Sequence, residues 1–209
     1  LCKKFKRIKM FVIGICGGTG SGKSTFAQSL EKHFNKLGVI KIISDSYYKN
    51  NSNLNLIKRS KINYDHPNSI DFKLLIKNLK TLKNNTKIKE PIYSYTSHKR
   101  LKKNKIIFPK KIIILDGLHI FCNDKIIELI DFGIYLDVDE KTRLKRRIKR
   151  DIISRGRSQE EVEKRFFSMC KPMHEKYIDP SKKYADLIIK SKTISIKKVI
   201  NLISEKIIF

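Results

Sequence analysis

Residues 17–24 read GGTGSGKS and match the pattern GxxxxGK(S/T) of a phosphate-binding loop. The loop directly follows an apolar run at residues 11–16 (FVIGIC), which is typical of a buried strand. After the loop, a helix is expected with one apolar face, made by Phe26, Leu30, Phe34 and Leu37. A strand, a glycine-rich loop and a helix in this order predict a site for a nucleoside triphosphate.

The residue types of the loop explain this chemistry. Glycines let successive backbone N–H groups point into one concavity, and the helix that follows presents its positive end to phosphate oxygens. Lys23 can reach the β and γ phosphates, and the Ser24 hydroxyl can ligate Mg²⁺. We therefore expect nucleotide binding by Gly17, Gly18, Thr19, Gly20, Ser21, Gly22, Lys23, Ser24 and Thr25.

Two carboxylates follow other apolar runs. Asp116 ends residues 112–115, which is the layout of a Walker B carboxylate near Mg²⁺. Asp45 ends the expected buried strand at 39–44, which should lie beside the first strand. A carboxylate there can accept the proton of an attacking hydroxyl, as a kinase base does; the other interpretation of Asp45 is a cap or turn residue.

The composition narrows the class of protein. A chain of 209 residues with 40% hydrophobic residues is long enough for one domain with a proper core. Four scattered cysteines and the absence of a CxxC pair predict a reducing, cytoplasmic location, and no run is long enough for a membrane span. The net charge of +27 comes from lysines spread along the chain among Ile and Asn, so we expect no specific nucleic-acid partner.

The order of elements predicts an α/β fold. Further strands are expected at 112–115, 134–138 and 185–189, with helices after Asp71, at about 124–130, at 142–157, after Ser158 and at about 195–207. Alternation of strands and helices predicts a P-loop NTPase-type, doubly wound parallel sheet with helices on both faces. Residues 1–209 should form a single kinase domain: 10–48 hold the phosphate loop and catalytic strand, 85–110 a small β-hairpin appendage, and 140–158 an arginine-rich helical lid.

The basic segment at 142–157 has two expected faces. Arg143, Arg147 and Arg150 fall on one side of the helix, whereas Leu144, Ile148 and Ile152 fall on another. We expect the aliphatic side to pack and the other side to offer guanidinium groups.

Six motifs resemble those of the uridine/cytidine kinase family, in order and through most of the chain. They are GGTGSGKST (17–25), DSYYK (45–49), NYDHP (63–67), PIYSYTSHKR (91–100), RRIKRDIISRGRS (146–158) and PSKKYADLII (180–189). The resemblance implies phosphorylation of the 5′-hydroxyl of uridine and cytidine to UMP and CMP, with ATP or GTP as donor and Mg²⁺ as cofactor. It also implies a homotetramer.

The same resemblance assigns roles to residues. Asp45 matches the catalytic base, and Lys23, Arg150 and Arg155 match groups that approach the transferring phosphate. Substrate-binding positions are matched by Asp65 and Arg147 at the ribose hydroxyls, Tyr93 and His98 at the pyrimidine edge, Arg157 on the substrate side, and Arg165. Ser24 and Asp116 match the positions near the metal.

The chain departs from the family pattern at three places. Asp116 stands where the family usually has Glu, so we expect its Mg²⁺ contact to run through water. Arg165 stands where a Gln that holds the nucleoside is expected. Residues 190–193 (KSKT) replace a Gly-rich segment that lies against the donor base. The opening Leu1, with Met10 before the first strand, suggests a non-standard start codon or an extension.

Two other functions compete with this interpretation. A phosphoribulokinase-like enzyme would share the phosphate loop but act on an acceptor that already bears a phosphate; Tyr93 and His98 favour a nucleoside instead. A non-catalytic, basic RNA-binding module would show salt-dependent RNA binding and no need for Asp45.

Overall fold

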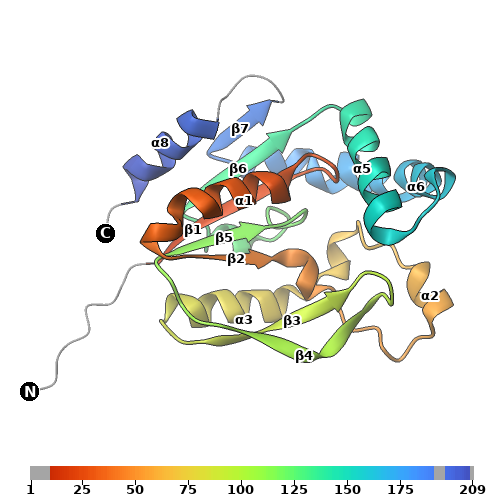
Figure 1. The fold of residues 1–209 in the computed structure, drawn as a ribbon, viewed down its shortest axis with the longest axis horizontal. Helices are drawn as coiled ribbons and strands as arrows, with labels where there is room; N and C mark the ends of the chain where they lie inside the picture. Colours follow the sequence, from red (N-terminus) through yellow and green to blue (C-terminus); the bar gives the residue numbers. More distant parts are fainter. Residues whose placement is uncertain (1–9, 191–195, 208–209) are drawn as a thin grey trace, which may run out of the picture.

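The computed structural model describes residues 10–190 and 196–207. Its centre is a five-stranded parallel sheet of β1 (Phe11–Gly17), β2 (Val39–Ile43), β5 (Ile112–Asp116), β6 (Phe132–Asp137) and β7 (Leu187–Lys190), in the order β2-β5-β1-β6-β7. The helices α1 (Lys23–Phe34) and α8 (Ile196–Lys206) cover one face, and α3 (Phe72–Lys83) covers the other (Figure 1). The predicted α/β parallel sheet with helices on both faces is confirmed.

The core forms two apolar layers, one on each side of the sheet. On one side Ile13 and Ile15 of β1 pack with Leu30 of α1 and Val199 of α8. On the other side Val12 belongs to the same cluster as the apolar face of α3, namely Leu75, Leu79 and Leu82. Because the central strands are buried on both faces, they are apolar throughout and easy to find in the sequence.

Shorter helical segments connect these elements. The α-helical ones are α2 (Leu56–Ser60), α4 (Asp124–Ile127), α5 (Glu140–Arg155), α6 (Gln159–Arg165) and α7 (Lys171–Met173). The 3₁₀ or π segments are η1 (Asn35–Leu37), η2 (Ser44–Tyr47), η3 (Pro67–Ser69), η4 (Phe166–Cys170), η5 (His174–Ile178) and η6 (Pro180–Tyr184). Asp71 and Ser158 cap α3 and α6 as expected, each accepting a backbone N–H in the first turn.

Two expectations about the first half of the chain are wrong. Leu37 does not belong to the buried face of α1, because the α-helix ends at Phe34 and Leu37 lies exposed in η1. The strand that precedes Asp45 does not lie beside β1: β5 separates them, so β2 is an edge strand and only Ile42 in it is buried. Asp45 itself lies in η2, just past the strand.

The predicted hairpin is present, with a longer second strand than expected. β3 (Ile88–Ser94) pairs with β4 (Lys99–Ile107) as an antiparallel pair apart from the main sheet. Most side chains of β4 are exposed and many are lysines. Such a strand is held by backbone hydrogen bonds to one partner and shows no hydrophobic alternation, so the sequence indicated only its end at residues 105–108.

The expected faces of the basic helix α5 are wrong in one respect, because part of the arginine side is buried while the aliphatic side is half-buried or exposed. Arg143 and Arg147 are buried, whereas Ile152 is 43% exposed. The arginine side packs because its guanidinium groups have partners: Arg143 donates to the carbonyl of Val138, and Arg147 donates to the hydroxyl of Thr19. Within residues 10–190 and 196–207, no helix is both long and apolar enough to cross a membrane.

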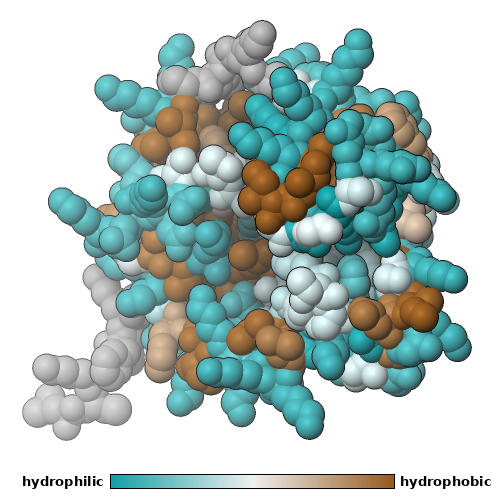
Figure 2. Space-filling model, turned by 45° about the vertical axis from the view of Figure 1, so that its right-hand side comes forward, coloured by the Kyte–Doolittle hydropathy of each residue, from teal (hydrophilic) through white to brown (hydrophobic). Residues whose placement is uncertain are grey.

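Figure 2 shows one face of the molecule, on which hydrophilic side chains cover most of the surface and hydrophobic ones form separate patches. The large share of hydrophilic surface agrees with the composition of the whole chain, which has 47 Lys and Arg residues and 20 Asp and Glu residues. Charge of this kind affects solubility and non-specific binding more than it defines a site.

Candidate active site

The phosphate loop turns sharply between β1 and α1, and glycine is required at this turn. Gly20 and Gly22 have φ values of 77° and 96°, in the left-handed region that favours glycine. A side chain at Gly20 would also collide with the backbone oxygen of Arg143. Without side chains in the way, an anion can approach the backbone N–H groups at the N-terminus of α1, where negative charge is stabilised.

Three side chains meet at the base of this loop. Ser24 donates a hydrogen bond of 2.7 Å to Oδ2 of Asp116, which ends the neighbouring strand β5. Lys23 Nζ donates to the carbonyl of Gly18 at 3.0 Å. Burial lowers the pKa of Lys23 and raises that of Asp116, although each charge partly offsets the effect on the other. A hydroxyl and a carboxylate side by side suit Mg²⁺, which usually takes few protein ligands beside phosphate oxygens.

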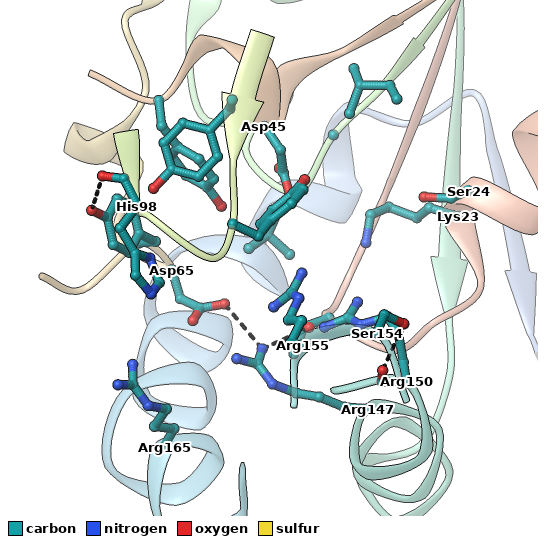
Figure 3. Close-up of a pocket in the computed structure, with 18 of the residues that line it drawn as sticks. Lys23, Ser24, Asp45, Asp65, His98, Arg147, Arg150, Ser154, Arg155 and Arg165 are labelled. Atoms are coloured by element: carbon teal, nitrogen blue, oxygen red, sulfur yellow. Dashed lines mark hydrogen bonds and ion pairs between the residues drawn. The ribbon is translucent and has the colours of Figure 1, made fainter. Parts of the chain in front are cut away.

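A cavity of about 370 Å³ opens beside the loop (Figure 3). It brings together Lys23, Ser24, Asp45, Asp65, Tyr93, His98, Asp116, Arg147, Arg150, Arg155, Arg157 and Arg165, all singled out from the sequence. Thr19 of the loop also lines it, whereas the loop glycines, Ser21 and Thr25 do not. The side chains come from α1, η2, β5, the hairpin, α5, α6 and the loops between them, so distant parts of the chain line one cavity.

Asp65 and Arg147 form the link between the loop and the far wall of the cavity. Arg147 Nη1 lies 3.6 Å from Oδ1 of Asp65 and donates to Thr19 Oγ1 at 2.8 Å. The thiol of Cys170 donates to the other oxygen of Asp65 at 3.1 Å, and a ring nitrogen of His119 lies 2.7 Å from the Asp65 carbonyl. Figure 3 shows Asp65 and Arg147 facing each other, with this ion pair dashed. Both the side chain and the backbone of Asp65 are therefore held in place.

The far wall is aromatic. The ring of Tyr48 lies 5.0 Å from the rings of both Tyr64 and Tyr93, and His98 stacks on Tyr64 at 5.4 Å with an interplanar angle of 15°. Burial, and then the charges of Arg157 and Arg165, lower the pKa of His98, so its imidazole is neutral at pH 7. Flat rings with polar tips can stack on a planar ligand and hydrogen-bond its edge.

Asp45 lines the cavity from η2, just past β2, and its carboxylate accepts a hydrogen bond there. The hydroxyl of Tyr95, at the hairpin tip, donates to Asp45 Oδ2 at 3.2 Å. The guanidinium of Arg155 lies 4.6 Å from the centre of the Tyr95 ring. Asp45 is thus in contact with the hairpin and, through it, with α5.

The sequence analysis missed several residues of the site. Tyr48 and Tyr64 stand inside the motifs DSYYK and NYDHP, next to residues that were singled out, and Tyr95 stands between Tyr93 and His98. Asp151, inside RRIKRDIISRGRS, pairs with four arginines of the site. The motifs could have indicated all four, and Asp151 contacts arginines only one to six positions away. The bond from Tyr95 to Asp45 joins residues 50 positions apart, which spacing cannot show.

Arg165 lies at the cavity but its guanidinium is already engaged. Its Nε donates to Oε1 of Glu161 at 3.0 Å, and its Nη2 donates to the carbonyl of Ser60 at 3.2 Å. This residue therefore ties α6 to the end of α2 at the rim. Of the other departures, the shorter Asp116 still reaches Ser24, and residues 191–193 lie outside the described part of the chain.

A glycine loop at a helix N-terminus, a Ser–Asp pair beneath it and a carboxylate across the same cavity define the class of phosphate-loop kinases. The comparison of sequences makes the assignment narrower. The chain belongs to the phosphoribulokinase/uridine kinase family, whose profile matches residues 12–196.

Individual relatives agree with this assignment. The chain is 44% identical over 178 residues to the uridine kinase of Clostridium tetani, covering 85% of each protein. It is 42% identical over 181 residues to the uridine kinase of Macrococcus caseolyticus, covering 87% of this chain and 88% of the relative. The solved phosphoribulokinase of Rhodobacter spheroides superposes with a TM-score of 0.65 at 15% identity, over 87% of this chain and 70% of that one, which is a likeness of fold alone.

Proposed function

We propose that this protein is a uridine kinase that transfers the γ-phosphoryl group of ATP or GTP to the 5′-hydroxyl of uridine and cytidine. One observation carries the proposal: a single cavity joins the phosphate loop to an aromatic wall suited to a planar base, with Asp45 lining the same space. The similarity to uridine kinases over 85% of the chain supports the same acceptors.

The loop side of the cavity would hold the donor. The backbone of residues 17–22 and the end of α1 would bind the phosphates, with Lys23 close to the β and γ groups. Ser24 and Asp116 would hold Mg²⁺, which when bound neutralises charge on the phosphate oxygens. Arg150 and Arg155, from α5, would approach the group in transfer.

The opposite side would hold the acceptor. Asp65 would accept hydrogen bonds from the ribose hydroxyls, with Arg147 as its partner 3.6 Å away. Tyr93 and the neutral imidazole of His98 would read the edge of the pyrimidine, and Arg157 and Arg165 lie at the same wall. A site that hydrogen-bonds one base discriminates strongly against a base that leaves those groups unpaired.

Asp45 would act as the general base. Its carboxylate would accept the proton of the 5′-hydroxyl while the bond between oxygen and phosphorus forms. The Tyr95 hydroxyl, which donates to Asp45 at 3.2 Å, fixes the orientation of that carboxylate.

A thermal-shift screen tests the proposed function. We expect UMP and CMP to raise the melting temperature, because a ligand that binds only the folded state stabilises it. Stabilisation by ribulose 5-phosphate alone would favour a phosphoribulokinase-like acceptor, and stabilisation by a short RNA alone would favour the RNA-binding module. The expected homotetramer stays a prediction that rests on the resemblance, and the expected cytoplasmic location stays a prediction that rests on the cysteine pattern.

Replacing His98 with alanine should weaken binding of the nucleoside alone. Loss of a base contact leaves a polar edge unpaired, at a cost of about 1 to 3 kcal/mol. We expect the KM for uridine and cytidine to rise accordingly in steady-state assays, while the KM for the triphosphate changes little. The control is His33→Ala on the exposed side of α1. An equal rise in both KM values would show that His98 is structural.

The lowered pKa of His98 also predicts a dependence on pH. The neutral imidazole should persist throughout the neutral range, so the KM for uridine should stay flat there. It should rise only below the ordinary histidine pKa of about 6.5, where protonation adds a charge beside Arg157 and Arg165. KM measured against pH checks this, and the same rise in His98→Ala would assign it to another group.

A further inference from the structure

Asp151 is a buried carboxylate at the centre of the arginine cluster on α5. Its side chain is fully buried, and it does not line the cavity. Arg150 Nε lies 2.8 Å from its Oδ1. Its Oδ2 lies 3.2 Å from Arg157 Nη1, 3.5 Å from Arg155 Nη1 and 3.6 Å from Arg147 Nε.

The four arginines around Asp151 all line the cavity. They divide between its two sides, because Arg150 and Arg155 belong to the proposed donor side and Arg147 and Arg157 to the acceptor side. One negative charge therefore lies among four positive ones that serve both substrates. Without it, four neighbouring guanidinium groups would repel one another, although Arg147 and Arg157 would keep their ion pairs with Asp65 and Glu161.

The chemistry of a carboxylate suits this arrangement. Two oxygens offer about four lone-pair directions, so one buried carboxylate can contact several guanidinium groups at once and restrict the position of each. The arginines hold the pKa of Asp151 below its usual range even though burial alone would raise it, so the carboxylate is ionised at neutral pH.

We propose that Asp151 is a positioning residue that aims the donor-side and acceptor-side arginines into the cavity together. It acts through Arg147, Arg150, Arg155 and Arg157 and touches neither substrate. This inference rests on the proposed function, because the roles of the arginines come from it.

A purely structural role for Asp151 makes a different prediction. A buried ion pair that only stabilises the fold would, when broken, lower the melting temperature and leave the folded enzyme with its normal rate. Positioning predicts a split between kcat and KM. Replacement by Asn removes a negative charge, so the electrostatic attraction of the site for the triphosphate in the ground state is not weakened. The arginines are, however, no longer held in the orientation in which they contact the phosphoryl group during transfer.

The test compares Asp151→Asn and Asp151→Glu with the wild-type protein. For Asn we expect kcat to fall by about 10 to 100-fold, because a displacement of about 1 Å can cost about 10²-fold, while the KM for ATP does not rise. Glu keeps the charge but moves the carboxylate by one methylene, so we expect a smaller fall in kcat with a melting temperature close to that of the wild type. Glu140→Gln, which removes from the same helix a half-buried charge paired with Lys171 at 3.1 Å, is the control for net charge and should keep the wild-type kcat.

Two results would overturn the proposal: wild-type kcat in folded Asp151→Asn, or a KM for ATP that rises in step with the fall in kcat. If Asp151→Asn does not fold, Asp151→Glu decides, and wild-type kcat in that variant overturns the proposal. The kcat and KM of each variant are compared with those of the wild-type protein, using the acceptor that the wild-type protein phosphorylates. A wild-type protein inactive on uridine but active on another acceptor would thus contradict the proposed function while still testing Asp151.

Discussion

Asp45→Asn should lower the turnover of uridine by about 10² or more while the protein still binds its ligands. Asparagine keeps the shape of the side chain and can still accept a hydrogen bond from Tyr95, which now donates at 3.2 Å. It removes the basic oxygen that would take the proton of the acceptor hydroxyl. Calorimetry should therefore give nearly unchanged affinities for uridine and the nucleotide, and a rate assay should show the loss.

The matched control is Asp124→Asn, which changes an exposed aspartate in the first turn of α4 that does not line the cavity. Survival of the rate in Asp45→Asn would make Asp45 a turn residue and place the base elsewhere. Loss of binding for both ligands would make it structural.

Lys23→Ala should abolish most phosphoryl transfer without weakening the fold. Removal of one group that stabilises developing charge commonly costs about 10² or more in rate. Burial lowers the pKa of Lys23, which means that its charge is unfavourable in the folded protein without phosphates. We therefore expect a melting temperature at or above that of the wild type, together with the loss of turnover.

Lys32→Ala provides the comparison for Lys23, because it removes an exposed charge from the last turn of the same helix. It should change neither the rate nor the melting temperature appreciably. Near-normal turnover in folded Lys23→Ala would contradict the assignment of the loop.

Much of the fold was predictable because its central elements carry local signals. β1 and β5 are apolar on both faces, and the glycines of the loop have backbone angles that other residues rarely adopt. The order of strands was not predictable in this way. The sequence gives no sign that β5 lies between β1 and β2, because that depends on which strands pair.

The faces of α5 show where periodicity fails. A pattern of apolar spacing favoured burial of Leu144, Ile148 and Ile152, yet Arg143 and Arg147 are the buried residues. Guanidinium groups can be buried when they are paired and hydrogen-bonded. Arg143 donates to the nearby carbonyl of Val138, whereas the partners of Arg147, Asp65 and Thr19, lie far away in the sequence. Ordered motifs indicated many of the residues that line the cavity, whereas the contacts among them required the structure.

The central claim is that the protein phosphorylates the 5′-hydroxyl of a pyrimidine nucleoside. Its most direct test is product analysis after incubation of the protein with uridine, ATP and Mg²⁺. Our account predicts one uridine 5′-monophosphate for each ADP formed, and likewise cytidine 5′-monophosphate from cytidine. Formation of ADP without either monophosphate, or phosphorylation of ribulose 5-phosphate with uridine left untouched, would contradict it.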